Sequence, residues 1–196
     1  MPKLDEATMQ KRRQHIVDAA MRQFEKLGFG GASVDAICAE AGISKGAFYT
    51  HFPSKEAVML ALLAQRGDTY ARIEAATLAD LEEAFFNLML RGLSYVDSRL
   101  EMEAVTSGAS NLPIREALTD NSEQCLYALR EAIDRLVAEE KVEMVGDITT
   151  AEAAELLVTY ALGRLALQVY EMENRDRENR RGLAITISGV MRPVSG

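Results

Sequence analysis

Apolar residues recur at the three- and four-residue spacing of a helix along nearly the whole chain, and the short alternating patterns typical of strands are rare. In the first such segment Ile16, Ala20 and Phe24 fall on one side of a helix, and Gly28 follows as a stop signal. We therefore predict an all-α fold of about nine helices. They are expected over about residues 8–27, 33–41, 44–52, 54–75, 78–98, 100–111, 113–141 (with an interruption near 119–122), 149–173 and 177–191.

Two of the predicted helices are short and follow each other directly. Ser33 and Ser44 stand at the cap positions before them, Gly42 lies in the turn between them, and Pro53 closes the second. Two short helices joined by a glycine-containing turn, behind a supporting helix, form the outline of a helix-turn-helix DNA reader.

The second short helix lies in the segment ISKGAFYTHFPSKE, residues 43–56. Phe48 and Phe52 are four residues apart and predict a buried side that holds the helix at its angle. The opposite side is predicted to face the major groove, and it carries Lys45, Gly46, Ala47, Tyr49, Thr50 and His51. Small residues there allow a close approach to base edges, whereas Tyr49, His51 and Lys55 suit phosphate oxygens.

The charge distribution changes the first impression given by the net charge of −8. Residues 1–55 hold eight Lys or Arg against six acids, a net of +2, so the other 141 residues carry −10. Such an asymmetry is consistent with an N-terminal part that meets an anionic partner and a larger part that does not.

Other chemistry is sparse. Cys38 and Cys125 stand alone, without metal-ligand spacing, and are predicted to be buried apolar residues. No apolar run approaches the ~18 residues of a membrane span, and the first residues do not resemble a secretory signal. We expect a cytoplasmic protein with no cofactor and no metal.

The stretch GFGGASVDAICAEAGISKGAFYTHFPSKEAV, residues 28–58, resembles the DNA-binding signature of the Tet repressor (TetR) family of bacterial regulators. The positions that carry the resemblance are Ser33-Val34, Ile37, Ala41-Gly42-Ile43-Ser44, the run Phe48-Tyr49-Thr50-His51-Phe52, and Lys55. The resemblance covers about 50 of the 196 residues. It implies a helix-turn-helix domain over 1–53 and an effector-binding and dimerisation domain over 54–196, with helix 54–75 connecting the two.

The resemblance also implies roles for single residues. Lys45, Gly46 and Ala47 would lie nearest the bases, Tyr49, His51 and Lys55 would hold the backbone, and Ser33 and Ser44 would be caps near phosphate. Asp35 departs from the pattern, because many members carry a basic residue shortly after the start of the second helix, and no DNA contact is expected from it. Lys11, Arg12 and Arg13 are either further DNA contacts or an ordinary solvated helix end.

The acidic two-thirds of the chain has no motif of similar specificity. Thr149 and Glu152 have the form of a capping box and open a strongly apolar helix. The resemblance implies that this helix and the last one pair with their copies in a homodimer, for which the candidates are Leu157, Ala161, Leu165, Leu183, Ile187 and Val190. The alternative is that they form an intramolecular core. Candidates for lining an effector pocket are Asn87, Arg91, Tyr95, Tyr127, Arg130, Tyr160 and Gln168.

The sequence therefore favours a transcriptional regulator, most simply a dimeric repressor released from a palindromic operator by a small-molecule effector. Two other functions stay open. An all-helical metal-carboxylate enzyme would need Glu-x-x-His pairs, but the two histidines, His15 and His51, do not follow a glutamate at that spacing. A DNA-binding protein without a ligand would lack a large apolar cavity.

Overall fold

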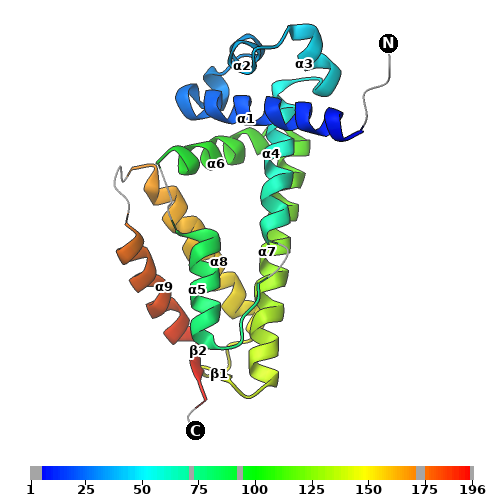
Figure 1. The fold of residues 1–196 in the computed structure, drawn as a ribbon. Helices are drawn as coiled ribbons and strands as arrows, with labels where there is room; N and C mark the ends of the chain where they lie inside the picture. The colour runs from blue at the N-terminus through cyan, green and yellow to red at the C-terminus, as the bar shows by residue number, and fades with distance from the viewer. Residues whose placement is uncertain (1–5, 71–72, 92–94, 171–174, 195–196) are drawn as a thin grey trace. The chain divides into compact units, whose positions relative to one another are not determined.

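The computed structural model describes residues 6–70, 73–91, 95–170 and 175–194. Within these ranges the chain forms nine helices and one pair of short strands (Figure 1). The elements are α1 (Glu6–Gly31), α2 (Val34–Ala41), α3 (Lys45–His51), α4 (Lys55–Tyr70), α5 (Leu78–Met89), α6 (Tyr95–Gly108), α7 (Leu112–Ala138), β1 (Val142–Met144), α8 (Thr150–Gln168), α9 (Asp176–Val190) and β2 (Met191–Pro193). The predicted all-α class is confirmed.

Helix starts follow the caps that the sequence predicted. The hydroxyls of Ser33 and Ser44 accept hydrogen bonds from Ala36 N and Ala47 N at 3.1 and 3.2 Å. Thr149 and Glu152 form the complete capping box at the start of α8. These bonds satisfy donors that have no partner within the first turn of a helix, so local chemistry fixes where each helix begins.

Several predicted helices differ from the observed ones: α4 ends at Tyr70 instead of about residue 75, and α8 ends at Gln168 instead of about residue 173. The segment expected to be helical over 78–98 ends as α5 at Met89, where Leu90 N and Arg91 N both bond to Phe86 O. Helix α6 then covers 95–108 instead of about 100–111. The interruption expected near 119–122 is wrong, because α7 is continuous from Leu112 to Ala138.

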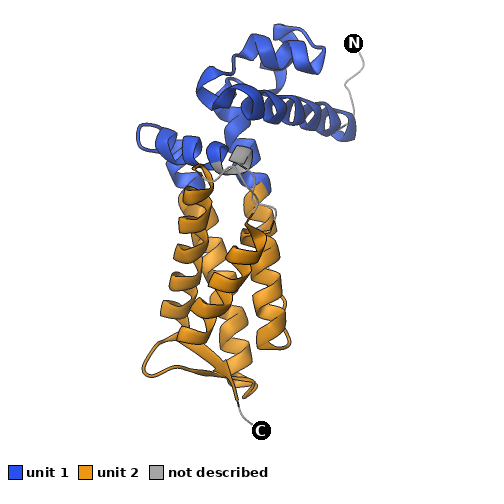
Figure 2. Ribbon diagram, turned by 90° about the vertical axis from the view of Figure 1, so that its left-hand side faces the viewer, with its two compact units in different colours: residues 1–65, 99–118 blue, residues 66–98, 119–196 orange. Residues whose placement is uncertain are grey.

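The chain divides into two compact units, drawn in different colours in Figure 2. Unit 1 comprises residues 1–65 and 99–118, and unit 2 comprises residues 66–98 and 119–196. The first domain was predicted to end at residue 53. Unit 1 also includes residues from α4, α6 and α7, because these join the same apolar core as the N-terminal helices. That core is built around Phe24, Phe48, Phe52, Met59, Leu100 and Ile114.

Unit 2 is held together mainly by the packing of α8 on α9 and of α5 on α9. The Tyr160 hydroxyl donates to Asn179 O at 3.1 Å, and Arg164 Nε donates to the Asn179 side chain at 2.6 Å. Strands β1 and β2 pair antiparallel, with Glu143 opposite Arg192. The strands were not predicted, because three-residue segments carry too little alternation to be distinguished from loops.

The six residues proposed from the sequence for a dimer interface lie inside this packing. Leu157, Ala161, Leu165, Leu183, Ile187 and Val190 are each at most 8 % exposed in the single chain. They therefore belong to the intramolecular core, which was the alternative interpretation, and a partner would have to contact other faces of α8 and α9.

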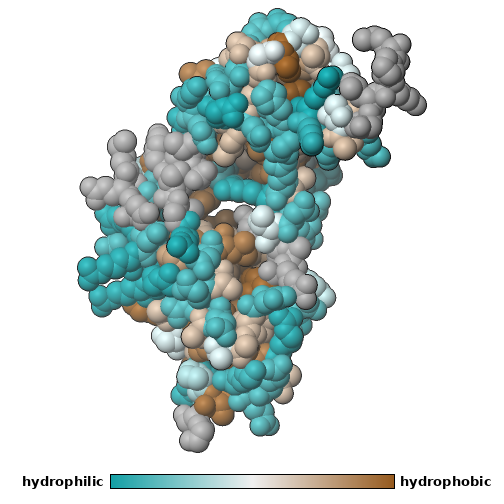
Figure 3. All heavy atoms as spheres, viewed as in Figure 1, coloured by the Kyte–Doolittle hydropathy of each residue, from teal (hydrophilic) through white to brown (hydrophobic). Residues whose placement is uncertain are grey.

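Both cysteines are free and buried, as predicted. Burial raises the pKa of the Cys125 thiol to about 11. Hydrophilic residues cover most of the face drawn in Figure 3, with hydrophobic residues in smaller patches among them. In the described residues no helix is both long enough and apolar enough to cross a bilayer.

Candidate nucleic-acid interface

Helix α3 has one buried side and one exposed side. Phe48 is fully buried and Phe52, at the C-cap, is 1 % exposed, and the two rings lie 6.1 Å apart. The residues predicted to face DNA are exposed: Lys45, Gly46, Ala47, Tyr49 and Thr50, with His51 half-buried at the end. The Tyr49 ring packs edge-on against Phe48 at 5.4 Å, and the Tyr49 side chain is 54 % exposed. The burial pattern therefore matches the predicted division of the helix.

The turn between α2 and α3 needs a glycine. Gly42 has φ 65° and ψ 34°, a left-handed conformation that side chains with a Cβ rarely adopt, and its N–H bonds back to α2. Ile43 N adds a bond to Cys38 O at 3.0 Å. This turn fixes the direction in which α3 leaves α2.

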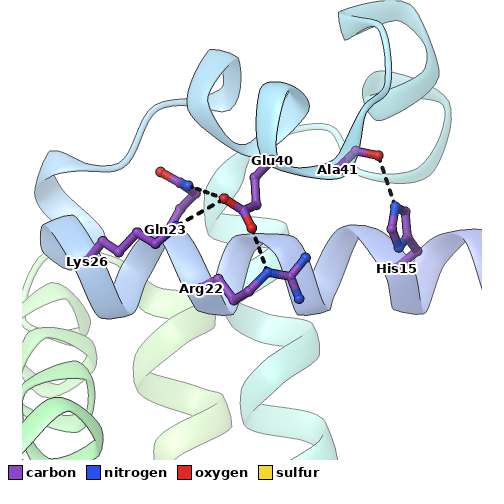
Figure 4. Close-up of polar contacts among 6 residues, drawn as sticks. All are labelled: His15, Arg22, Gln23, Lys26, Glu40 and Ala41. Carbon is purple, nitrogen blue, oxygen red and sulfur yellow. Dashed lines mark hydrogen bonds and ion pairs between the residues drawn. The ribbon is translucent and has the colours of Figure 1, made fainter.

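A polar cluster fastens α2 to α1 (Figure 4). Glu40 of α2 accepts hydrogen bonds from Arg22 at 2.7 Å, Gln23 at 2.9 Å and Lys26 at 3.2 Å, all on α1. The bonds from Arg22, then Lys26 and Gln23, lower the pKa of Glu40 to about 2. His15 Nε2 lies 2.9 Å from Ala41 O and adds a contact at the end of α2. The supporting helix thus positions the reader from one side.

Arg13 fixes the other end of the reader. Its guanidinium donates to His51 O at 3.0 Å and lies 4.0 Å from the centre of the Phe52 ring. A guanidinium stacked on an aromatic ring and bonded to the last turn of α3 stabilises that turn. Arg13 is therefore a structural residue in this arrangement, which decides the question that the sequence left open for this one residue.

Lys45, at the first position of α3, is paired within the protein. Its ammonium lies 2.6 Å from Asp35 on α2, and both side chains are exposed. The hydrogen bond and the negative charge of Asp35 raise the pKa of Lys45. The carboxylate that departs from the family pattern thus holds the lysine expected nearest the bases.

Lys55 was predicted to contact phosphate, but the structure gives its ammonium other partners. It donates to Phe29 O at 2.7 Å, Ala32 O at 3.0 Å and Gly30 O at 3.3 Å, and lies 4.7 Å from the Phe29 ring centre. These carbonyls close the C-terminal end of α1, where a positive charge is favourable. We therefore assign Lys55 to the stability of unit 1 and do not retain it among the predicted phosphate contacts.

The end of α1 also has partners on α6, within the same unit. Gly28 has φ 74°, and the next residue, Phe29, donates its backbone N–H to the Glu103 carboxylate. Arg99 donates to Phe24 O at 3.0 Å and to Glu25 O at 2.6 Å. No local sequence signal pointed to these contacts, since the partners are more than 70 residues apart.

In unit 2, a cavity of about 1020 Å³ opens between residues 73–76, α5 and α7. Of the residues predicted to line a pocket, Asn87 lines this cavity, and Arg91 donates to Asn87 at 3.1 Å. The polar lining also includes residues that the sequence did not single out: Glu74, Asp80, Glu83, Glu131 and Arg135.

The other predicted pocket residues lie elsewhere. Tyr127 is 65 % exposed and donates to Glu131, while Arg130 pairs with Asp134 on the surface. Tyr160 and Gln168 belong to α8, and the side chain of Tyr95 lies outside the described residues. Within the described ranges no group of three or more His, Cys, Asp or Glu side chains is placed to hold a metal ion.

Comparison with known proteins agrees with this geometry. Residues 16–62 match the family described as bacterial regulatory proteins, tetR family. The HTH-type transcriptional regulator UidR of Escherichia coli K12 is 29 % identical over 93 % of this chain and 94 % of its own. The structure of Salmonella enterica GusR is similar with a TM-score of 0.71 and 25 % identity, covering 92 % of this chain and 95 % of that one.

A further solved structure shares the fold. SmeT, the repressor of the Stenotrophomonas maltophilia multidrug efflux pump SmeDEF, has a TM-score of 0.72 and 22 % identity, covering 92 % of this chain and 90 % of its own. The match of residues 16–62 includes the buried and exposed sides of α3, the caps and the left-handed turn. This chain belongs to the TetR family of helix-turn-helix transcriptional regulators.

Proposed function

We propose that this regulator is a homodimeric repressor that binds a palindromic operator through α3 of each copy and is released when a small-molecule effector occupies unit 2. The observation that carries the proposal is the combination of an exposed reader helix in unit 1 with a cavity of about 1020 Å³ in unit 2. A hollow of this size could hold a small molecule, which favours a ligand-responsive regulator over a DNA-binding protein without a ligand. SmeT, whose fold is similar, is a repressor, which supports the direction of regulation.

The lining of the cavity favours an effector with a positive charge. It holds four carboxylates, from Glu74, Asp80, Glu83 and Glu131, against the single guanidinium of Arg135. Arg180 pairs with Glu83, and Arg135 donates to Ile73 O at 2.9 Å. The excess of carboxylates over guanidinium groups in the lining suits an organic cation, while Ala84 and Ala128 leave room for its apolar part.

The dimer contact is proposed for the exposed faces of α8 and α9. Leu156, Gly163 and Leu167 fall on one side of α8, and Ile185 is 62 % exposed on α9. A Cβ added at Gly163 would have no neighbour within 4 Å, so another helix can approach closely there. Two copies of a small reader also match the two half-sites of a palindromic operator.

Release then follows from a population shift. An effector that binds one arrangement of the dimer more tightly reduces the population that fits the operator spacing. In this account the protein acts as a non-catalytic switch in the cytoplasm, where bacterial DNA lies.

The effector part is tested by thermal denaturation of the purified protein with organic cations and with carboxylates of similar size. A cation that raises the melting temperature and dissociates the protein–DNA complex supports the proposal, because a ligand that binds only the native state stabilises it. Glu131→Gln should weaken the binding of that cation, whereas Glu155→Gln, on the surface of α8, should leave its binding unchanged. Stabilisation by carboxylates alone would contradict the proposed ligand class.

The dimer is tested by sedimentation of Leu167→Glu and Ile185→Glu, with Leu112→Glu on α7 as the control for an exposed leucine. We expect the first two variants to be monomers and the third to remain a dimer. A wild-type monomer would contradict this part of the proposal.

A further inference from the structure

We propose that Lys11 and Arg12, on the N-terminal half of α1, form a DNA-backbone contact beside α3 and supply most of the positive charge that unit 1 offers to phosphates. The proposal rests on the DNA-binding function of α3 and adds to it the surface that holds the flanking backbone. It replaces Lys55 as the source of that charge.

The first observation is a groove between α1 and α3 with a volume of about 530 Å³. From α1 it is lined by Thr8, Lys11, Arg12 and His15, which are spaced three and four residues apart and so lie on one side of the helix. From α3 it is lined by Ala47, Thr50 and His51. The groove is therefore continuous with the exposed side of the reader.

The second observation is the partner of each cation near the reader. Lys45 is paired with Asp35, and Lys55 is bonded to carbonyls of the α1 end. Arg13 is bonded to His51 O and stacked on Phe52. Further along α1, Arg22 and Lys26 are both paired with Glu40.

Lys11 and Arg12 differ from these residues. Both are exposed, and within the described part of the chain neither has a hydrogen bond or ion pair with another residue. Their charges are thus available to an outside anion without breaking an internal contact, whereas Lys45 would have to leave Asp35.

The third observation is the chemistry of the groove itself. None of the described residues that line it is acidic, so the described lining holds no carboxylate that would repel a phosphate. Its floor is apolar, formed by Met9, Ile16 and Ile43. A cationic rim above an apolar floor suits a phosphate followed by a deoxyribose, and phosphate contacts fix the position of a reader helix without reading sequence.

The experiment compares the wild-type chain with the Lys11→Ala/Arg12→Ala double variant on an unrelated DNA duplex, by fluorescence anisotropy at several salt concentrations. Each phosphate contact contributes about 0.9 to the slope of log affinity against log salt, so the slope should fall by about 2. Accordingly, the ratio of wild-type to variant affinity should shrink about tenfold between ~50 mM and ~200 mM salt.

Two control variants make the result specific. Arg115→Ala/Arg130→Ala removes the same formal charge from exposed positions on α7, outside the groove and the cluster that holds α2, and should leave the slope nearly unchanged. Lys11→Arg/Arg12→Lys keeps the charges and should restore the wild-type slope. Circular dichroism confirms that each variant is folded.

An unchanged slope in the double variant would overturn the inference, as would an equal fall in the Arg115→Ala/Arg130→Ala control. Saturable binding of an amphipathic carboxylate in the groove, with an unchanged DNA slope, would also overturn it and assign the groove to a small molecule. Failure of the wild-type chain to bind any duplex would contradict DNA binding itself, so the two failures are distinguishable.

Discussion

The ammonium of Lys45, at the first position of α3, lies 2.6 Å from a carboxylate oxygen of Asp35, in the first turn of α2. Asp35 raises the pKa of Lys45 and holds its side chain beside the helix start. The same carboxylate places a negative charge next to the surface that we propose faces DNA. The reader lysine is therefore oriented by a residue that also opposes the approach of phosphate.

Replacing Asp35 by Asn should raise DNA affinity several-fold. The substitution removes a negative charge from the interface and frees Lys45 for phosphate or base contacts. Anisotropy titrations at constant salt measure the change. Asp18→Asn, which removes the same charge from an exposed site on α1, should have a much smaller effect; equal gains from both variants would mean that only net charge matters.

Replacing Lys55 by Met should destabilise the protein without changing the salt dependence of DNA binding. The ammonium bonds to the carbonyl oxygens of Phe29, Gly30 and Ala32, and its loss should cost about 1–2 kcal/mol. Urea unfolding measures the loss, with Lys11→Met as the control for an exposed lysine. If Lys55→Met lowered the salt slope by about 1 while stability stayed constant, the lysine would be a phosphate contact after all.

Replacing Glu40 by Gln should lower the melting temperature at neutral pH but not in acid. In the folded protein, Arg22, Lys26 and Gln23 lower the pKa of Glu40 from the ordinary 4.5 to about 2. The Glu40 carboxylate therefore contributes its full stabilisation at pH values above 4.5. That contribution is lost as the pH falls from about 4.5 to about 2. The melting curves of wild type and variant should therefore converge over this range. Glu25→Gln, at an exposed site on α1, should show no such convergence. A pH-independent difference for Glu40→Gln would contradict the ion-pair account.

Replacing Gly182 by Ala should destabilise unit 2 by about 1–3 kcal/mol, because an added Cβ would overlap the Tyr160 hydroxyl that bonds to Asn179 O. A Cβ added at Gly189, on the same helix, would have no described neighbour within 4 Å. Its replacement by Ala should be neutral or stabilising by about 0.5–1 kcal/mol. Thermal denaturation of the pair measures both, and equal effects would mean that α8 and α9 do not pack as closely as described.

The parts of the fold that the sequence predicted depend on local chemistry. Ser33, Ser44 and Thr149 bond to backbone groups within three residues, and Phe48 and Phe52 share one side of a single short helix. Such features need no knowledge of the rest of the chain. The division of α3 into a buried and an exposed side was therefore predictable.

The parts that could not be predicted depend on distant partners. Whether Lys55 meets phosphate or the carbonyl of Phe29 is decided by how α4 meets the end of α1, 26 residues away in sequence. The inward position of Leu157 and Ala161 depends on α9, because α8 is apolar over a wide arc and its periodicity alone does not choose a face. The acidic cavity is assembled from three separate segments, none of which carries a motif.

The central claim is that α3 reads a specific operator. The most direct test is to titrate a duplex from the DNA upstream of the protein's own gene with the protein, in the presence of excess unrelated duplex. We predict a salt-sensitive complex that survives the competitor and is lost in the Gly46→Glu variant. This substitution places a carboxylate on the exposed side of α3. It should not disturb the fold, because the Cβ that it adds has one neighbour within 4 Å among the described residues, Ser44 Oγ at 3.8 Å. A complex that the unrelated duplex removes equally well, or that Gly46→Glu leaves intact, would contradict the claim.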